Sequence, residues 1–148
     1  MAGLIALDTN VYIAALRDRE RLIQLKRFLM RTGTRLRLSA VVALELRAGA
    51  RTAAHADAVQ ALVEPYDEHE HVIVPSFAAY VESGRALAAL GARGGIDLSR
   101  ATALFADALI ATSCREEGVK LVTENVRDFA ALERHLRGFK FASAGKAM

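Results

Sequence analysis

Disulfides, histidine clusters and long apolar runs are all missing from this 148-residue sequence. Its single cysteine, Cys114, has no second cysteine to pair with, which excludes an internal disulfide and indicates a reducing compartment. No stretch approaches the roughly 20 apolar residues that a membrane-spanning helix needs. The first residues, MAGLIALDTN, contain no basic n-region, and their apolar run is too short for a signal peptide. The sequence therefore predicts a cytoplasmic protein with no membrane partner.

The four histidines do not form a ligand pattern. His55, His69, His71 and His135 are scattered in polar surroundings and lack the spacing of zinc ligands, so surface histidines are the predicted interpretation. Cys114 has no base placed beside it and is not a credible nucleophile. Any chemistry must therefore rest on other side chains.

The composition indicates an ordinary globular protein with an aliphatic core. Hydrophobic residues make up 53% of the chain, whereas aromatic residues make up only 6%. A chain of this length can bury roughly 70% of its unfolded surface, so one core is expected. There is no internal repeat, low-complexity tract or domain boundary. We therefore expect a single domain over residues 1–148.

Short apolar runs alternate with helical patterns along the chain. Runs without polar alternation are typical of strands buried on both faces. The predicted strands are Leu4–Leu7, Leu36–Leu38, Val72–Val74 and Val119–Val122, with a brief fifth at Lys140–Phe141. Strands separated by helices indicate an α/β fold with a parallel sheet and helices on both faces.

Capping residues and glycines suggest where the helices begin and end. The predicted helices run from Thr9 or Asn10 through Leu16, from Glu20 to about Thr32, from a Ser39 cap through Gly49, from Ala53 to Val63 with an end near Pro65, from a Ser76 cap to about Ala92, around Asp107 up to a stop at Gly118, and over a short segment containing Asp128 and Phe129. Gly91, Gly94 and Gly95 are predicted to form a flexible joint.

Two acidic residues occupy helix faces that are otherwise apolar. The helical neighbours of Asp107 are Ala103, Leu104, Ile110 and Ala111, and those of Glu45 are Val41, Val42, Ala48 and Gly49. A lone buried carboxylate costs several kcal/mol unless it is paired, neutralised or bound to a metal. The two acids indicate either a functional site or internal salt bridges to arginines from other elements.

Further polar residues follow the predicted strands. Asp8 comes directly after the first strand, and Thr123 and Asn125 follow the fourth. Sites in open parallel sheets form beyond the carboxyl ends of the strands, where several acids would repel each other unless a divalent cation lay between them. Oxygen ligands without a histidine or cysteine cluster favour magnesium or manganese. Helix capping by Asp8 to Asn10, and a capping box of Asn125 with Asp128, is the alternative interpretation.

Three segments resemble, in this order, the signature blocks of the PIN domain. They are ALDTNVYIAAL, the glutamate in SAVVALELRAG, and ADALIATSCREEGVKLVTENVRDF. Their order and spacing are similar to those of the VapC-type toxins of bacterial toxin and antitoxin pairs, and they span Leu4 to Phe129. The resemblance implies a PIN-like three-layer fold in which a short parallel sheet of four to five strands is flanked by helices. It also implies a metal-dependent endoribonuclease that uses Mg²⁺ or Mn²⁺ to hydrolyse RNA.

The same resemblance implies roles for individual residues. Asp8, Glu45, Asp107 and Asp128 are the implied metal ligands; Asn125 is a further catalytic candidate; and Thr9, Asn10 and Thr123 are supporting residues. Relatives often carry an acid where this chain has Asn125, so the number of metal ions, one or two, is open. A homodimer and a cognate antitoxin are the implied partners.

Basic charge is concentrated in one part of the chain. The net charge is only +3, but residues 17–37 contain eight basic and two acidic side chains. Such a segment is either a phosphate-binding surface or a solvated helix face. If it binds the RNA backbone, Arg27 and Arg31 are the predicted contacts.

Two other functions remain as alternatives. A phosphatase or phosphotransferase with an acidic metal site would want a second acid two residues after Asp8, where this chain has Asn10. A non-catalytic PIN-like module that binds RNA or a partner would have little reason to retain Asp8, Glu45 and Asp107 together. Both fit the residues less well than the nuclease.

Overall fold

Five parallel strands form the centre of the fold in the computed structural model, which describes residues 3–93, 97 and 101–148. The strands are β1 (Leu4–Leu7), β2 (Leu36–Ser39), β3 (Val72–Ile73), β4 (Val119–Thr123) and β5 (Phe141–Ser143). Their order is β3-β2-β1-β4-β5, and every neighbouring pair is parallel. The predicted α/β fold with a short parallel sheet is confirmed.

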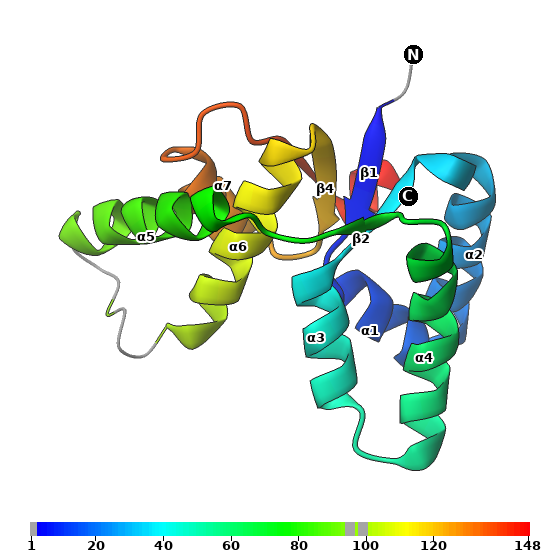
Figure 1. Ribbon diagram of the computed structural model, residues 1–148. Helices are drawn as coiled ribbons and strands as arrows, with labels where there is room; N and C mark the ends of the chain where they lie inside the picture. The colour runs from blue at the N-terminus through cyan, green and yellow to red at the C-terminus, as the bar shows by residue number, and fades with distance from the viewer. Residues whose placement is uncertain (1–2, 94–96, 98–100) are drawn as a thin grey trace.

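Helices cover both faces of this sheet. They are α1 (Thr9–Arg17), α2 (Arg19–Thr32), α3 (Ala40–Gly49), α4 (Ala53–Glu68), α5 (Phe77–Ala92), α6 (Thr102–Glu116), α7 (Val126–Glu133) and α8 (Ala144–Ala147), with a 3-10 turn at Gly33–Arg35. In Figure 1, α5, α6 and α7 lie on one side of β1 and β4, and α1 to α4 lie on the other. Ala6, Leu7, Leu121 and Val122 are therefore buried whichever face they point to, as the unbroken apolar runs predicted.

The predicted end of α4 near Pro65 is wrong, because the helix continues through Pro65 to Glu68. A proline inside a helix removes one backbone hydrogen bond. Contacts beyond it compensate here: the hydroxyl of Tyr66 lies 3.2 Å from that of the buried Tyr12, and the Tyr66 carbonyl accepts a 2.8 Å hydrogen bond from the His71 N–H. Tertiary packing therefore outweighs the local breaker.

Smaller differences concern the helix ends. The N-cap of α1 is Asp8 rather than Thr9 or Asn10. Gly91 lies inside α5, while Gly94 and Gly95 of the predicted joint lie outside the described residues. Within the described ranges, no helix is both long and apolar enough to cross a membrane.

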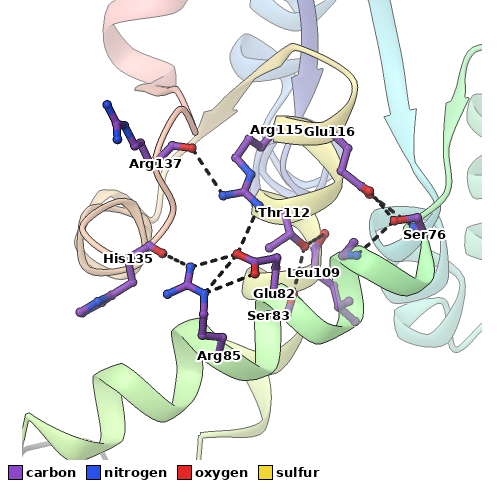
Figure 2. A network of polar contacts seen from close by, with 11 residues as sticks. Ser76, Glu82, Ser83, Arg85, Leu109, Thr112, Arg115, Glu116, His135 and Arg137 are labelled. Atoms are coloured by element: carbon purple, nitrogen blue, oxygen red, sulfur yellow. Dashed lines mark hydrogen bonds and ion pairs between the residues drawn. The ribbon is translucent and has the colours of Figure 1, made fainter.

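Polar contacts join α6 to α5 on the face of the sheet that these two helices cover (Figure 2). The Glu82 carboxylate on α5 accepts a 3.5 Å hydrogen bond from Arg115 on α6. Deeper in the interface, the buried hydroxyls of Ser83 and Thr112 lie 3.0 Å apart. These contacts join the helix that carries Asp107 to α5.

Candidate active site

Asp8 lies where β1 ends, and the residue is only 4% exposed. One oxygen, Oδ1, accepts the backbone N–H of Thr9 at 2.8 Å, and the other, Oδ2, accepts the hydroxyl of Thr123 at 2.6 Å. Burial raises the pKa of Asp8, and these two hydrogen bonds oppose that rise because they favour the ionised form. The carboxylate is therefore held in one orientation at the carboxyl edge of β1 and β4.

Glu45 on α3 joins the same edge through Thr9, whose hydroxyl donates a 2.7 Å hydrogen bond to its Oε1. Glu45 is half-buried, and of its apolar helical neighbours Val42 is buried whereas Ala48 and Gly49 are exposed. Val42 and Leu46 make the core contacts of α3 instead. Figure 1 shows α3 projecting beyond the ends of the strands, where there is no sheet to pack against.

Asp107 is buried in the middle of α6, with 9% of its surface exposed. The side-chain amide of Asn125 lies 3.4 Å from its Oδ2 and donates to it. The ion pairs of the described residues include neither Asp107 nor Glu45. Within those residues, internal salt bridges to arginines therefore do not explain the two helix acids.

Like charges surround Asp107. Burial is the largest cause that raises its pKa from 3.8 to about 7, and the nearby carboxylates of Asp8, Asp128 and Glu45 raise it further. Electrostatic coupling of this kind needs short separations between the groups. The four acids therefore share one region, although they come from four separate parts of the sequence.

Asn125 and Asp128 lie at the turn between β4 and α7. Asn125 is the N-cap of α7 and accepts the backbone N–H of Asp128 at 3.5 Å, but its own N–H donates to Thr123, so only the N-cap half of the alternative capping box is present. Its amide also donates to Asp128 Oδ2 at 3.0 Å and to Asp107. The same side chain thus caps a helix and links two of the acids.

Thr123 and Asn10 connect this turn to β1. The Thr123 hydroxyl accepts the Asn125 N–H at 2.9 Å and the Asn10 amide at 3.4 Å while it donates to Asp8. Asn10 in turn accepts the N–H of Glu124 at 3.2 Å. Thr123 is therefore the central hydrogen-bonding group of the cluster, and Asn10 holds the turn against α1.

Sequence analysis missed the ion pair that reaches this turn from α2, between Arg21 and Glu124. No local pattern signals it, because Arg21 is one of many arginines in the basic segment. Arg27 and Arg31 are exposed on α2, and the guanidinium of Arg31 lies 5.9 Å from the centre of the Phe28 ring. Among the described residues, no hydrogen bond or ion pair joins Arg27 or Arg31 to the acids, and their contact with RNA stays a prediction.

The acids suit a hard divalent cation in their chemistry but are not arranged around one. In the described part of the chain, no three Asp, Glu, His or Cys side chains converge closely enough to hold a metal ion. The carboxylates point instead to the hydroxyl and amide donors described above. Carboxylate and hydroxyl oxygens are ligands of Mg²⁺ and Mn²⁺, and a cation would relieve the repulsion that raises the pKa of Asp107. The residues present therefore fit such an ion in the chemistry of their donor atoms.

Comparison with known proteins relates this geometry to a family. The sequence model of the PIN domain matches residues 5–134. No curated protein matches the sequence. Similar solved structures include the DNA-bound VapBC from Salmonella typhimurium, with a TM-score of 0.68, 22% identity and coverage of 96% of this chain and 98% of that chain.

Two further structures show the same likeness. VapBC2 from Rickettsia felis, bound to a DNA fragment from its promoter, has a TM-score of 0.64, 20% identity and coverage of 95% of this chain and 98% of that chain. VapBC-1 from nontypeable Haemophilus influenzae has a TM-score of 0.65, 21% identity and coverage of 95% of this chain and 97% of that chain. At these identities the likeness is one of fold.

Proposed function

The chain belongs to the PIN domain family, and from that premise we propose that it is a metal-dependent endoribonuclease that hydrolyses RNA phosphodiester bonds. One observation carries the proposal: Asp107 is buried beside the acids Asp8, Asp128 and Glu45, and burial together with these like charges raises its pKa to about 7. Such repulsion destabilises the folded protein, and clusters of this kind are typical of sites that bind a charged ligand. Membership of the PIN domain family supports the assignment of that chemistry to a nuclease.

The side chains of the cluster divide into ligands and the residues that orient them. The proposed ligands of Mg²⁺ or Mn²⁺ are Asp8, Glu45, Asp107 and Asp128. A bound ion of this kind lowers the pKa of a water molecule and offsets the charge that develops on the phosphate. Thr123 orients Asp8, the Thr9 hydroxyl orients Glu45, and the Asn125 amide orients both remaining acids. Fixed ligands reduce the reorganisation that accompanies reaction.

We extend the proposal to a biological setting. The similar VapBC structures support a role as the toxin component of a type II toxin and antitoxin module, located in the cytoplasm and inhibited by a cognate antitoxin protein. A phosphatase site would want a second acid two positions after Asp8, but this position is occupied by Asn10. Its amide and carbonyl already hold the β4–α7 turn.

A homodimer is the second proposed assembly, and it should place the start of α5 in its interface. Val74, Phe77, Tyr80 and Val81 are 55% to 83% exposed, and Phe77, Tyr80 and Val81 share one helix face. We expect light scattering on the purified chain to give a mass near twice 16.0 kDa. Replacing Phe77 with lysine should lower it to the monomer mass, while replacing the exposed Met30 on α2 should not. A monomeric wild-type chain would contradict this.

Metal removal tests the proposed activity directly. We expect cleavage of a structured RNA in the presence of added Mn²⁺ or Mg²⁺, and its loss in excess chelator, because the acids alone neither activate water nor offset phosphate charge. Asp8→Asn protein purified in the same way controls for contaminating nucleases. Undiminished cleavage in chelator would remove the metal-dependent mechanism. Release of phosphate from a simple phosphomonoester without RNA cleavage would favour a phosphatase, and metal and RNA binding without cleavage would favour the non-catalytic module.

A further inference from the structure

A basic pocket lies at the amino-terminal ends of β1 and β4, whereas the acidic residues lie at the carboxyl-terminal ends of these strands. It has a volume of about 540 Å³. Its lining residues include Arg35, Arg115, Lys120 and Lys140, and none of the lining residues is acidic. The basic side chains belong to the turn before β2, the end of α6, β4 and the segment before β5. Four elements thus contribute positive charge to one hollow that the acidic site does not use.

Two of these cations are side by side on neighbouring strands. Leu121 of β4 pairs with Phe141 of β5, so Lys120 and Lys140 stand next to each other one residue earlier. Both side chains are exposed, and within the described residues neither ammonium group makes a hydrogen bond or an ion pair. Like charges opposite each other on adjacent strands disfavour the folded state. The pair therefore costs stability that no partner within the described chain offsets.

The two arginines differ in how much charge they leave available. Arg35 donates a 3.3 Å hydrogen bond to the carbonyl of Gly3, a neutral acceptor that leaves its charge uncompensated. Arg115 lies between the Glu82 carboxylate, at 3.5 Å, and the Arg137 carbonyl, at 3.4 Å (Figure 2). Glu82 partly neutralises Arg115. Three cations, Arg35, Lys120 and Lys140, thus remain for a ligand.

Two glycines leave the wall of the pocket open. Gly118 and Gly138 both line it and both have a left-handed backbone, with φ values of +65° and +90°. A Cβ atom at either position would meet no atom within 4 Å. The space beside the lysines is therefore free, and an anion can approach the backbone closely there.

We propose that this pocket binds phosphate groups of an RNA strand outside the cleavage centre. The proposal rests on the proposed nuclease function and names a second contact for the same substrate. The cations stand on separate elements around an open hollow, which suits a chain of phosphates rather than one enclosed ion. β4 rises by about 13 Å from Val119 to Thr123, so the pocket and the acids lie at opposite ends of one strand. Only an RNA longer than a few nucleotides would reach both places.

The binding test uses the full chain in chelator, so that no cleavage is needed. Fluorescence anisotropy of a labelled RNA hairpin is measured between 50 and 200 mM KCl for wild type and for Lys120→Gln/Lys140→Gln. Each lost phosphate contact should reduce the salt slope by about 0.7, so the double variant should lose about 1.4 and bind roughly tenfold more weakly at low salt. Arg93→Gln/Lys146→Gln removes the same charge from exposed positions elsewhere and should keep the wild-type slope.

A charge-reversal variant distinguishes a loss of RNA binding from a loss of folding. Lys120→Glu should pair with Lys140, so its melting temperature should equal or exceed that of the wild type while RNA binding falls further than in Lys120→Gln. Equal slopes and affinities for the lysine variant and its control would overturn the proposal. So would displacement of the RNA by millimolar inorganic phosphate beyond the effect of KCl at equal ionic strength, since that result assigns the pocket to free phosphate.

Cleavage assays keep this proposal separate from the nuclease proposal. In metal, Lys120→Gln/Lys140→Gln should raise the KM for the hairpin and leave kcat unchanged, because the pocket lies away from the reacting bond. A dinucleotide substrate should be cleaved equally by variant and wild type. A protein that cleaves no RNA but shows the loss of salt slope would retract the nuclease and retain the phosphate site.

Discussion

Replacing Asp107 with asparagine should raise the stability of the metal-free protein at pH 8 by roughly 2 to 4 kcal/mol and lower RNA cleavage at least about a hundredfold. The stability gain follows from the environment of Asp107, which is 9% exposed and close to three other acids. Asparagine has nearly the same shape and carries no charge. The activity loss follows because the substitution removes one of the proposed metal ligands, and the metal ion stabilises the transition state by several kcal/mol.

The direction in which Asp107 changes stability with pH follows from its pKa in the folded and unfolded states. The pKa of Asp107 is about 7 in the folded protein and near 3.8 when the chain is unfolded. Below about pH 4 the group is protonated in both states and costs nothing. Between about pH 4 and pH 7 the unfolded chain ionises first, so wild-type stability falls as pH rises, and the full cost is present above pH 7. Asp107→Asn should lack this decline.

Denaturant unfolding in chelator at pH 4, 6 and 8 measures the difference. Asp57→Asn, which neutralises an exposed acid on α4, is the matched control and should follow the wild type. Added Mn²⁺ should stabilise the wild type by RT ln(1 + [L]/Kd) and stabilise Asp107→Asn much less. If Asp107→Asn instead loses about 3 to 5 kcal/mol in chelator, Asp107 is half of a structural pair and not a metal ligand.

Thr123→Val should have the second largest effect, because it removes the hydroxyl that joins β1 to the β4–α7 turn. That hydroxyl is buried, donates to Asp8 at 2.6 Å and accepts the Asn125 N–H at 2.9 Å. Leaving buried groups unsatisfied costs about 1 to 3 kcal/mol. Loss of a residue that orients a metal ligand typically costs about 10-fold to 100-fold in activity. We expect both losses.

Thr112→Val provides the control. Thr112 is also fully buried, but its hydroxyl lies 3.0 Å from Ser83 in the α5–α6 interface rather than at the acids. This variant should lose a similar amount of stability and keep the cleavage rate of its folded fraction. Equal activity losses in the two variants, measured at a temperature where both are folded, would mean that Thr123 acts through stability alone.

Local pattern was enough for much of the fold. Buried parallel strands show as unbroken apolar runs, and the five predicted runs correspond to β1 to β5. Ser39 and Ser76 cap α3 and α5 as predicted, because a side-chain oxygen that satisfies an orphan N–H works within three residues. The pattern failed at Pro65, where contacts of Tyr66 with Tyr12 carry α4 past its local stop signal.

The sequence by itself determined that Asp8 and Asn125 follow strands and that Asp107 interrupts an apolar helix face. Only the tertiary structure decided that these residues meet, because periodicity reports which side of an element faces the core and not which elements are neighbours. Parallel pairing of β1 with β4 brings Thr123 to Asp8 across 115 positions of sequence. The pairing of β4 with β5 likewise places Lys120 beside Lys140. Strand order therefore creates both the acidic cluster and the basic pocket, which lie at opposite ends of the strands.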